Sequence, residues 1–498
     1  MTGLSAGLMC TWESILVVFA IGFRNGGPAG LLYGLTLVWL GNLSVFMVIG
    51  ELSSAIPTAG GQYHWVSLLA PRSSKNFFSY MTGWLTVIGW IAALTSTAFF
   101  VSDLTLSLVE LNVSQYSREL WHATLLLWGT LLLCVFINIF VSGALPTIEV
   151  VVLIIHILGF FGILVPLVYL TSSHNAAKEV FKTFNNFGGW QSRALAFFVG
   201  LQGNALAFVG TDSPVHMSEE VRNASVDVPR SMLLSLIING CLSIGMMLAV
   251  LFSAGDIAQI LETNASPVSA AMVIFERVTG SKTGATVMTS IIVVLEFCSA
   301  MGCLAAASRM TWSFARDRGL PFSRVLSMID KRTTIPVVSI LVATGFSALL
   351  ALINIGNSVA FNGTISLVLE GFYISYFLAI GLLLWRRLRG DMDKTNTSLT
   401  AFSSSAAQDE IYDRKLTWGP WRIRGTFGVV NNIVACCYLL LMVFFSFWPA
   451  QLIVSNPADM NWAVLVTGCV AIFSVGYYLV YARKSYKGPV VEVDPHIL

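Results

Sequence analysis

The chain has 498 residues, of which 56% are hydrophobic and only 11% carry a charged side chain. Soluble globular domains have about 25% charged residues, so this composition excludes an ordinary soluble protein. It predicts an all-α polytopic membrane protein in contact with membrane lipid. The net charge of +2 gives no indication of a nucleic-acid partner.

Segments of about 20 apolar residues, the length that crosses a bilayer as a helix, divide the chain into twelve predicted transmembrane helices. They cover residues 4–23, 29–53, 77–109, 121–141, 148–171, 194–217, 231–253, 284–308, 335–354, 360–385, 425–447 and 461–482. The first segment has no basic n-region and continues directly into further spans, so we interpret it as mature structure and not as a signal peptide.

Basic residues are unevenly distributed between the two sides of these spans. If the N-terminus is cytoplasmic, 21 of the 28 Lys and Arg residues lie in or near cytoplasmic segments. The positive-inside rule therefore predicts a multi-pass protein with both termini in the cytoplasm. A long polar loop connects spans 10 and 11, and within it the composition of the stretch 398–410 is typical of a disordered segment. We divide the chain into a membrane core of spans 1–10 (1–385), a cytoplasmic loop (386–424), spans 11 and 12 (425–482) and a cytoplasmic C-terminal tail (483–498).

The sixth predicted span, Ala194–Met217, contains residues that oppose a continuous membrane helix. Backbone groups released by a break in a helix are tolerated in a membrane only where protein buries them or where they line a cavity. The sequence therefore predicts a polar site inside the bilayer. Asp212 either takes part in coupling or gating, or caps the inner half of the interrupted helix. The residues that oppose the helix are Gly200, Gly203, Gly210, Asp212 and Pro214.

Other ionisable side chains also lie within predicted spans, where an unpaired charge is costly. Glu296 in span 8 and Glu370 in span 10 should therefore face a cavity or a polar partner, and both are candidates for coupling. Glu149 and His156 in span 5 are seven residues apart, which places them on one helix face. His156 is a further coupling candidate, although a neutral histidine packed in the core is the alternative.

The sequence indicates no catalytic residues, metal site or cofactor. It contains no Walker A motif, no H-E-x-x-H motif and no zinc-like spacing of Cys and His. Acidic residues in membrane spans without a nucleotide site are typical of a secondary transporter, and not of an enzyme. Asn112 begins an Asn-Val-Ser sequon in an extracellular loop, where we predict glycosylation.

Several motifs resemble those of one transporter family. The run Glu51–Trp65 (E-L-S-S-A-I-P-T-A-G-G-Q-Y-H-W) resembles the cytoplasmic hairpin of the amino acid, polyamine and organocation permeases. The stretches Asp212–Glu220 and Ala307–Pro321 agree with this resemblance. Trp418–Trp421 and Lys487–Val493 resemble motifs of the fungal branch that contains choline and 4-aminobutyrate permeases. The resemblance covers nearly the whole chain and leaves the choice of solute open.

The resemblance implies five plus five spans related as an inverted repeat, with spans 1 and 6 discontinuous and spans 11 and 12 appended. Exposed helix N-termini would face a carboxylate of the solute, and unwound carbonyls with Glu13 would face an amine. Trp12 and Phe208 would add cation–π contact. The predicted substrate site consists of the two breaks, at Thr11, Trp12, Glu13 and Ser14 in span 1 and at Ala207, Phe208, Val209 and Gly210 in span 6.

Each of these roles has a simpler alternative. Trp12 and Phe208 are aromatic residues in membrane spans, where packing is the common role. Glu13 either contacts the solute, serves as a coupling or gating carboxylate, or only hydrogen-bonds an unwound backbone. Few residues precede the break in span 1, fewer than the family has, so we expect a short first half-helix.

Charged residues follow spans 6 and 8 on the predicted cytoplasmic side. Glu219 and Glu220 follow the sixth span, and Arg309 and Arg316 follow the eighth. They form an inner gate in one interpretation and a solvated charged surface in the other.

Together these features predict a proton-coupled importer of a small amine-bearing solute, an amino acid, 4-aminobutyrate or choline. We expect it to work by alternating access in the plasma membrane, with the solute, protons and membrane lipid as its partners and without a cofactor or metal. Two alternatives stay open: a permease or exporter of a specialised nitrogen metabolite, and a nutrient receptor that no longer transports. The oligomeric state is left open.

Overall fold

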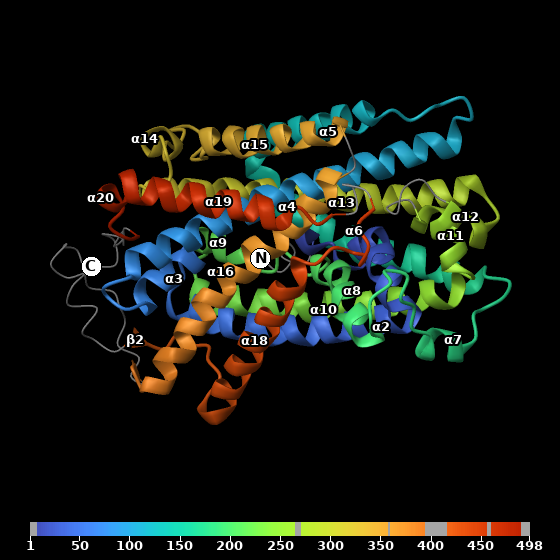
Figure 1. The fold of residues 1–498 in the computed structure, drawn as a ribbon. Coiled ribbons are helices and arrows are strands. Elements are labelled where there is room, and N and C mark those ends of the chain that lie inside the picture. The colour runs from blue at the N-terminus through green and yellow to red at the C-terminus, as the bar shows by residue number, and fades with distance from the viewer. Residues whose placement is uncertain (1–6, 264–269, 357–358, 394–415, 456–459, 490–498) are drawn as a thin grey trace.

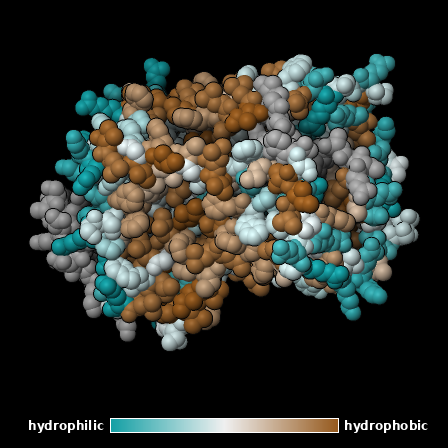
Figure 2. Space-filling model, viewed as in Figure 1, coloured by the Kyte–Doolittle hydropathy of each residue, from teal (hydrophilic) through white to brown (hydrophobic). Residues whose placement is uncertain are grey.

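The computed structural model is a bundle of helices, with one pair of two-residue strands in the part of the chain that it describes (Figure 1). It describes residues 7–263, 270–356, 359–393, 416–455 and 460–489. Figure 2 shows hydrophobic residues across the middle of the visible surface and hydrophilic residues gathered at both ends. This distribution is the one expected of a protein whose middle faces lipid.

Nine helices within these ranges are long and apolar enough to cross a bilayer, and Val337–Ile353 forms a shorter apolar helix. Such runs become helices because a lipid-exposed backbone must satisfy its polar groups internally. Their inward faces share one large hydrophobic cluster. The chain is therefore an all-helical, multi-span membrane protein. The ten helices, with the shorter one as α15, are α2 (Thr11–Ala55), α4 (Lys75–Asn112), α5 (Leu120–Phe140), α6 (Leu145–Tyr169), α10 (Ala224–Ser253), α13 (Lys282–Arg316), α15 (Val337–Gly356), α16 (Val359–Arg389), α18 (Gly425–Ser446) and α19 (Ala463–Tyr477).

Shorter elements gather at the two ends of the bundle (Figure 1). The α3 end carries α3 (Gln62–Leu69), α14 (Ser323–Leu326) and α20 (Arg483–Ser485). The opposite α7 end carries α7 (Ala177–Lys182), α11 (Ile257–Thr263) and α12 (Ala270–Thr279). The remaining short elements are η1 (Ser142–Ala144), α8 (Arg193–Leu206), α9 (Ser213–His216), η2 (Ser218–Glu220), η5 (Tyr478–Ala482) and the parallel pair β1 (Met392–Asp393) and β2 (Leu416–Thr417).

The element α2 holds two predicted spans, which meet at Gly27. This glycine has φ 62° and ψ −165°, outside the helical region. A side chain there would also lie 2.7 Å from the Asn185 backbone nitrogen, so glycine is required at this turn. Gly22 of the first segment faces Leu31 of the second, because a Cβ at Gly22 would lie 2.7 Å from a Leu31 methyl group. The two segments therefore pack against each other.

The first and sixth predicted spans are both interrupted inside the bundle. In the sixth, α8 ends at Leu206 and residues 207–212 form turns before α9. In the first, Cys10 adopts the left-handed conformation with φ 39° and ψ 49°, and α2 begins at Thr11. The predicted position of the first break, at Thr11–Ser14, is wrong. The Ser14 amide already donates to the Cys10 carbonyl oxygen at 2.8 Å, so these four residues form the first turn of a helix.

The connection between α16 and α18 begins as helix, since α16 continues past residue 385. Arg387 forms an ion pair with Glu51 of α2, and its guanidinium lies 4.6 Å from the centre of the Trp418 ring. The Ile423 amide donates to Glu51 Oε1 at 2.8 Å. The part of the predicted loop that follows residue 415 is therefore attached to the α3 end of the bundle. The stretch 398–410, predicted to be disordered, lies outside the described residues.

The C-terminal segment after α19 also packs against the core. Tyr486 is buried, and its hydroxyl lies 2.6 Å from Ser79 Oγ on α4. Its ring packs edge-on against Tyr80 and Phe314. The beginning of the predicted tail therefore belongs to the packed structure, and residues 490–498 lie outside the described part of the chain.

Candidate functional site

A small cavity, which we call the central cavity, lies where the two interrupted spans meet. No charged side chain is among the residues that line it, so backbone groups and the residues just behind the wall must hold any charged ligand. Its walls come from both interrupted spans and from α4, α13 and α16. The lining consists of Leu8, Met9, Ser14, Trp90, Ala93, Ser96, Thr97, Phe100, Leu206, Val209, Gly210, Ser299, Cys303 and Val368.

Two helix ends border the central cavity. The N-terminus of α2 begins between the lining residues Met9 and Ser14, and the C-terminus of α8 is the lining residue Leu206. The first amides of a helix and its last carbonyls have no partner within the helix, and they carry partial positive and negative charge respectively. A carboxylate and an ammonium group on one small molecule fit such a pair of ends.

Of the four residues predicted at the first break, Ser14 lines the central cavity and the other three do not. Trp12 is buried against α6, with ring-centroid distances of 5.7 Å to His156 and 5.9 Å to Phe160. Thr11 and Glu13 are also fully buried. The structure therefore gives Trp12 contacts typical of packing.

Glu13 and Ser14 connect α2 to two other helices through polar contacts. Glu13 Oε1 lies 2.7 Å from His156 Nδ1 on α6, and both side chains are fully buried. Ser14 Oγ donates to Glu296 Oε1 on α13 at 3.0 Å. We call Glu13, Ser14, His156 and Glu296 the Glu13 cluster. Three candidates that the sequence scattered over three spans thus meet at one helical turn beside the central cavity.

The Glu13 cluster has hydrogen-bonding capacity left over. Glu13 Oε2, Glu296 Oε2 and His156 Nε2 are buried, and the described part of the chain provides none of them with a hydrogen-bond partner. Buried polar groups are ordinarily hydrogen-bonded, and ionised carboxylates in a membrane interior are costly unless they are paired. The cluster therefore contains three buried polar atoms that still need a hydrogen-bond partner or a proton.

The four residues predicted at the second break also divide into two groups. Val209 and Gly210 line the central cavity, whereas Ala207 and Phe208 are buried outside its lining. Gly210 has φ 89°, a conformation that favours glycine. A Cβ at this position would lie 2.4 Å from a methyl group of Leu8, so the turn needs a residue without a side chain.

Asp212 stands just before α9 but does not cap that helix through its side chain. Its Oδ2 accepts a hydrogen bond from Gln62 Nε2 of α3 at 2.7 Å and lies 3.4 Å from His216 Nε2. The prediction that the Asp212 side chain caps the inner half-helix is therefore wrong. Asp212 joins the interrupted span to the hairpin at the α3 end.

Glu370 lies apart from the Glu13 cluster. Its carboxylate accepts a hydrogen bond from Thr467 Oγ1 of α19, and it does not line the central cavity. Within the described ranges, no group of three or more His, Cys, Asp or Glu side chains is arranged to hold a metal ion.

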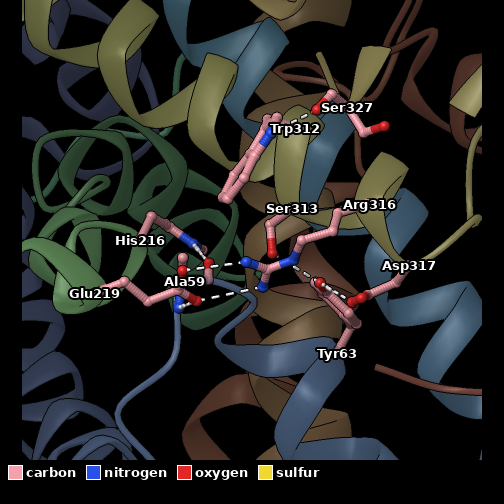
Figure 3. A network of polar contacts seen from close by, with 9 residues as sticks. All are labelled: Ala59, Tyr63, His216, Glu219, Trp312, Ser313, Arg316, Asp317 and Ser327. Carbon is pink, nitrogen blue, oxygen red and sulfur yellow. Dashed lines mark hydrogen bonds and ion pairs between the residues drawn. The ribbon is translucent and has the colours of Figure 1, made fainter. Parts of the chain in front are cut away.

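Two ion pairs connect η2 to α13 at the α3 end. Arg316 contacts the Glu219 carboxylate at 3.2 and 3.3 Å, and Arg309 Nε lies 2.6 Å from Glu220 Oε1. We call these four residues the α3-end network. Figure 3 shows Arg316 reaching Glu219, whose Oε1 also accepts a hydrogen bond from the Ala59 amide at 3.0 Å.

The helix α3 adds buried polar groups next to this network. The Tyr63 hydroxyl donates to Asp317 Oδ2 at 2.6 Å (Figure 3). Burial, together with the Asp317 carboxylate, raises the pKa of Tyr63 well above its ordinary value, so the hydroxyl stays a donor. Burial and the neighbouring Arg316 lower the pKa of His64 to about 4, so His64 is neutral near pH 7.

One wall of the central cavity was not predicted from the sequence. Trp90, Ala93, Thr97 and Phe100 recur every three or four residues and so share one face of α4. The third predicted span has no break or proline near these residues, and its one charged residue, Asp103, follows Phe100 by about one helical turn. The spacing alone is that of any membrane helix with a packed face, so the signal becomes visible only when the cavity is known.

Asn112 is the last residue of α4 and not part of the loop in which it was predicted to lie. Its side chain is exposed at the α7 end, but Nδ2 donates to the Leu108 carbonyl oxygen and to Thr286 Oγ1, both at 2.9 Å. A glycan on this nitrogen would have to replace these contacts.

The chain is similar in sequence to known permeases and transporters. A family model described as "Amino acid permease" matches residues 1–470. A putative amino acid/polyamine transporter of Macrophomina phaseolina is 30% identical over 444 residues, which cover 89% of this chain and 92% of the relative. The choline transporter of Saccharomyces cerevisiae is 29% identical over 97% of this chain and 81% of its own length. An amino-acid permease of Arabidopsis thaliana is 27% identical over 98% and 92%.

The family match covers well over half of the chain, and a fungal relative reaches 30% identity along most of both sequences. Multi-span architecture, interrupted spans and a cavity between them are what membrane transport of a small molecule requires. The chain belongs to the amino acid permease family, a family of transporters and not of enzymes.

Proposed function

We propose that this chain is a proton-coupled importer of a small amine-bearing solute, an amino acid, 4-aminobutyrate or choline. The observation that carries the proposal is the position of the Glu13 cluster, which contacts the central cavity through Ser14. A solute site and a protonatable site on the same turn of α2 allow one to influence the other. The relatives include a choline transporter and a putative amino acid/polyamine transporter, which supports this class of solute.

We propose the fold implied by the family for the full chain. The count of twelve spans follows if α2 supplies two, the pair α8 and α9 supplies the sixth, and α15 supplies the ninth. The first ten spans then form two inverted repeats of five. Their discontinuous members break at Cys10 and at residues 207–212, and α18 and α19 are the appended spans.

The amine of the solute is assigned to the C-terminal carbonyls of α8 and to the aromatic faces of α4. Trp90 and Phe100 line the central cavity, whereas Trp12 and Phe208 do not. A cation over such a ring gains about 0.5 to 2 kcal/mol, depending on how completely it is desolvated. A solute carboxylate, where one is present, is assigned to the first amides of α2.

We assign the proton to the Glu13 cluster. We assign the gate of alternating access to the α3 end. We propose that the α3 end is cytoplasmic, as the concentration of Lys and Arg in the predicted cytoplasmic segments supports. The α3-end network then holds the cytoplasmic side closed, and its ion pairs separate when the solute is released inward. The plasma membrane is the proposed location.

Labelled uptake in a host that lacks its own permeases tests the function. Choline, 4-aminobutyrate and a set of amino acids are offered at two external pH values, with and without a protonophore. We expect at least one solute to accumulate, faster at the lower pH, and accumulation to collapse when the protonophore is added. A protein that reaches the surface and admits none of these solutes contradicts the proposal. Preloaded cells show whether export is the physiological direction.

A pair of variants tests the assignment of the site. Trp90→Ala removes a ring from the central cavity and should raise the half-saturation constant for uptake about tenfold, in line with a cation–π contact. Trp121→Ala removes a half-exposed ring at the α7 end and serves as the control. Equal effects of the two substitutions contradict the assignment.

A further inference from the structure

A second cavity, which we call the side cavity, lies next to the central cavity. Glu149 is the only carboxylate among its lining residues, and the rest of the lining is almost entirely apolar. Its walls come from the segment before α2, the first two turns of α6 and the middle of α13. The lining consists of Gly7, Leu8, Leu145, Glu149, Val152, Cys298, Met301, Gly302 and Ala305.

Leu8 separates the two cavities, since it is a lining residue of both. Its side chain sits between two glycines, because a Cβ at Gly210 would lie 2.4 Å from one Leu8 methyl group and a Cβ at Gly302 would lie 2.9 Å from the other. The Leu8 carbonyl oxygen accepts a hydrogen bond from Ser299 Oγ at 2.6 Å. One side chain, held by a short and interrupted segment, thus forms the partition.

Glu149 lies on the side of this partition that is nearer to the α3 end. It belongs to the second turn of α6, the helix that starts at that end of the bundle. The charged groups that act on Glu149 include Arg309 and Glu220 of the α3-end network. Glu13 and Glu296 are fully buried, whereas Glu149 is partly exposed. This carboxylate therefore reaches the surface of the bundle, whereas the Glu13 cluster is enclosed.

We propose that the side cavity is a second binding station, which receives an organic ammonium ion after it leaves the central cavity. Displacement of Leu8 joins the two cavities, and the Glu149 carboxylate then accepts the ammonium group. The apolar lining, including Leu145, Val152 and Met301, contacts the hydrocarbon part of the solute. A nearby cation favours the ionised form of a carboxyl group, so binding and ionisation support each other. This inference rests on the proposed function, which supplies the amine-bearing solute.

Sided transport measurements test the station. Sealed plasma-membrane vesicles of one orientation, prepared from cells that express the full chain, are used with labelled choline and, as a second probe, 4-aminobutyrate. The half-saturation constant is measured once with solute on the outer, α7-end side of the protein and once with solute on the α3-end side. We expect Glu149→Gln to raise the α3-end constant about fivefold and to leave the outer constant within about twofold.

Two further variants make the result specific. Glu149→Asp keeps the charge and should restore most of the α3-end affinity. Glu179→Gln removes an exposed carboxylate from α7, at the opposite end, and should leave both constants unchanged.

Four outcomes overturn the station. Both constants can stay unchanged in Glu149→Gln, which leaves no role in binding. Both can change equally, which indicates a structural fault. The pH dependence can shift while the α3-end constant stays the same, which assigns Glu149 to protons. Finally, a wild-type protein that carries neither probe nor any amino acid overturns the proposed function and the station together. The first three outcomes, with wild-type transport intact, contradict the station alone.

Discussion

Acidic and basic side chains meet in two regions of this molecule under opposite conditions. In the Glu13 cluster, both members of the Glu13–His156 pair are fully buried. In the α3-end network, the side chains of Glu219 and Glu220 are 37% and 58% exposed. Attraction between unit charges about 4 Å apart is worth about 1 kcal/mol in water and several times more near or inside a protein. The buried contacts should therefore be harder to break than the exposed ones, which can separate and form again in the proposed transport cycle.

The largest effect is expected from replacing the buried carboxylate of Glu13. Glu13→Gln keeps the shape of the side chain but leaves His156 without its carboxylate partner. Breaking a buried pair destabilises a protein by about 3 to 5 kcal/mol. A change of this size in the energy of the coupling step corresponds to a fall in proton-driven uptake of at least about 100-fold, which we expect. Uptake is measured across external pH, with surface expression measured by immunoblot. Unchanged uptake with unchanged pH dependence removes Glu13 from the proton site.

The second prediction concerns the stability of the folded protein as the pH falls. His64 lies at the α3 end but is buried, and its pKa is lowered from 6.5 to about 4. An unfolded chain takes up this proton near pH 6.5 and the folded protein only near pH 4. The free energy of unfolding therefore has its full value above pH 6.5, where His64 is neutral in both states. It decreases by about 3 kcal/mol as the pH falls towards 4.

The measurement is the melting temperature of the protein in detergent as a function of pH. His64→Asn should remove much of the decrease between pH 6.5 and 4, whatever its effect at neutral pH. His174→Asn at the exposed α7 end is the matched control and should keep the wild-type profile. Parallel profiles for wild-type and His64→Asn contradict the assignment.

The third prediction concerns the Ser14 hydroxyl, which joins the Glu13 cluster to the central cavity. Ser14→Ala removes the hydrogen bond to Glu296 and changes one lining residue of the central cavity. A hydrogen bond contributes about 0.5 to 1.5 kcal/mol, so uptake should fall about 2- to 10-fold. Ser290→Ala, whose hydroxyl returns to the backbone of its own helix, is the control. A smaller effect for Ser14→Ala than for Ser290→Ala would exclude Ser14 as the link.

The smallest effect is expected in the α3-end network. Glu219→Gln and Arg316→Gln should each change the uptake rate only about threefold, because exposed pairs contribute about 0 to 1 kcal/mol. The exchanged pair Glu219→Arg with Arg316→Glu should recover part of the loss. A double-mutant cycle on uptake measures the coupling between the two side chains. A loss as large as that caused by Glu13→Gln would show that the exposed ion pairs matter as much as the buried contacts.

Apolar length was enough to place most helices, and it failed where the backbone departs from a helix for local reasons. The ends of α4 and α5 lie close to the predicted bounds because runs of apolar residues end there in polar ones. Cys10 gave no warning of a break, since cysteine is an ordinary residue in a membrane helix. Its left-handed conformation is supported by tertiary contacts, including the hydrogen bond from Sγ to the Leu295 carbonyl oxygen.

The candidate site was predictable in part for the same reason. His156 and Glu296 attracted attention because an ionisable side chain is costly in a membrane, and Glu13 because of the family resemblance. The structure brings these three together. Glu370 satisfied the same criterion but pairs with Thr467 on another helix. The cost of a buried charge predicts that a partner exists and does not say where it lies. Only the packing of distant spans decides that.

The attachment of Glu51 to Arg387 and Ile423 has a consequence for motion. It fastens the second segment of α2, the end of α16 and the segment before α18 into one body at the α3 end. In the proposed alternating access, other parts of the molecule would then rotate against this frame. Cys10, Gly27 and Gly210, where the backbone leaves the helical region, are the natural pivots. A covalent tether across the fastened body should leave turnover intact, whereas one across Leu8 and Gly302 should arrest the cycle.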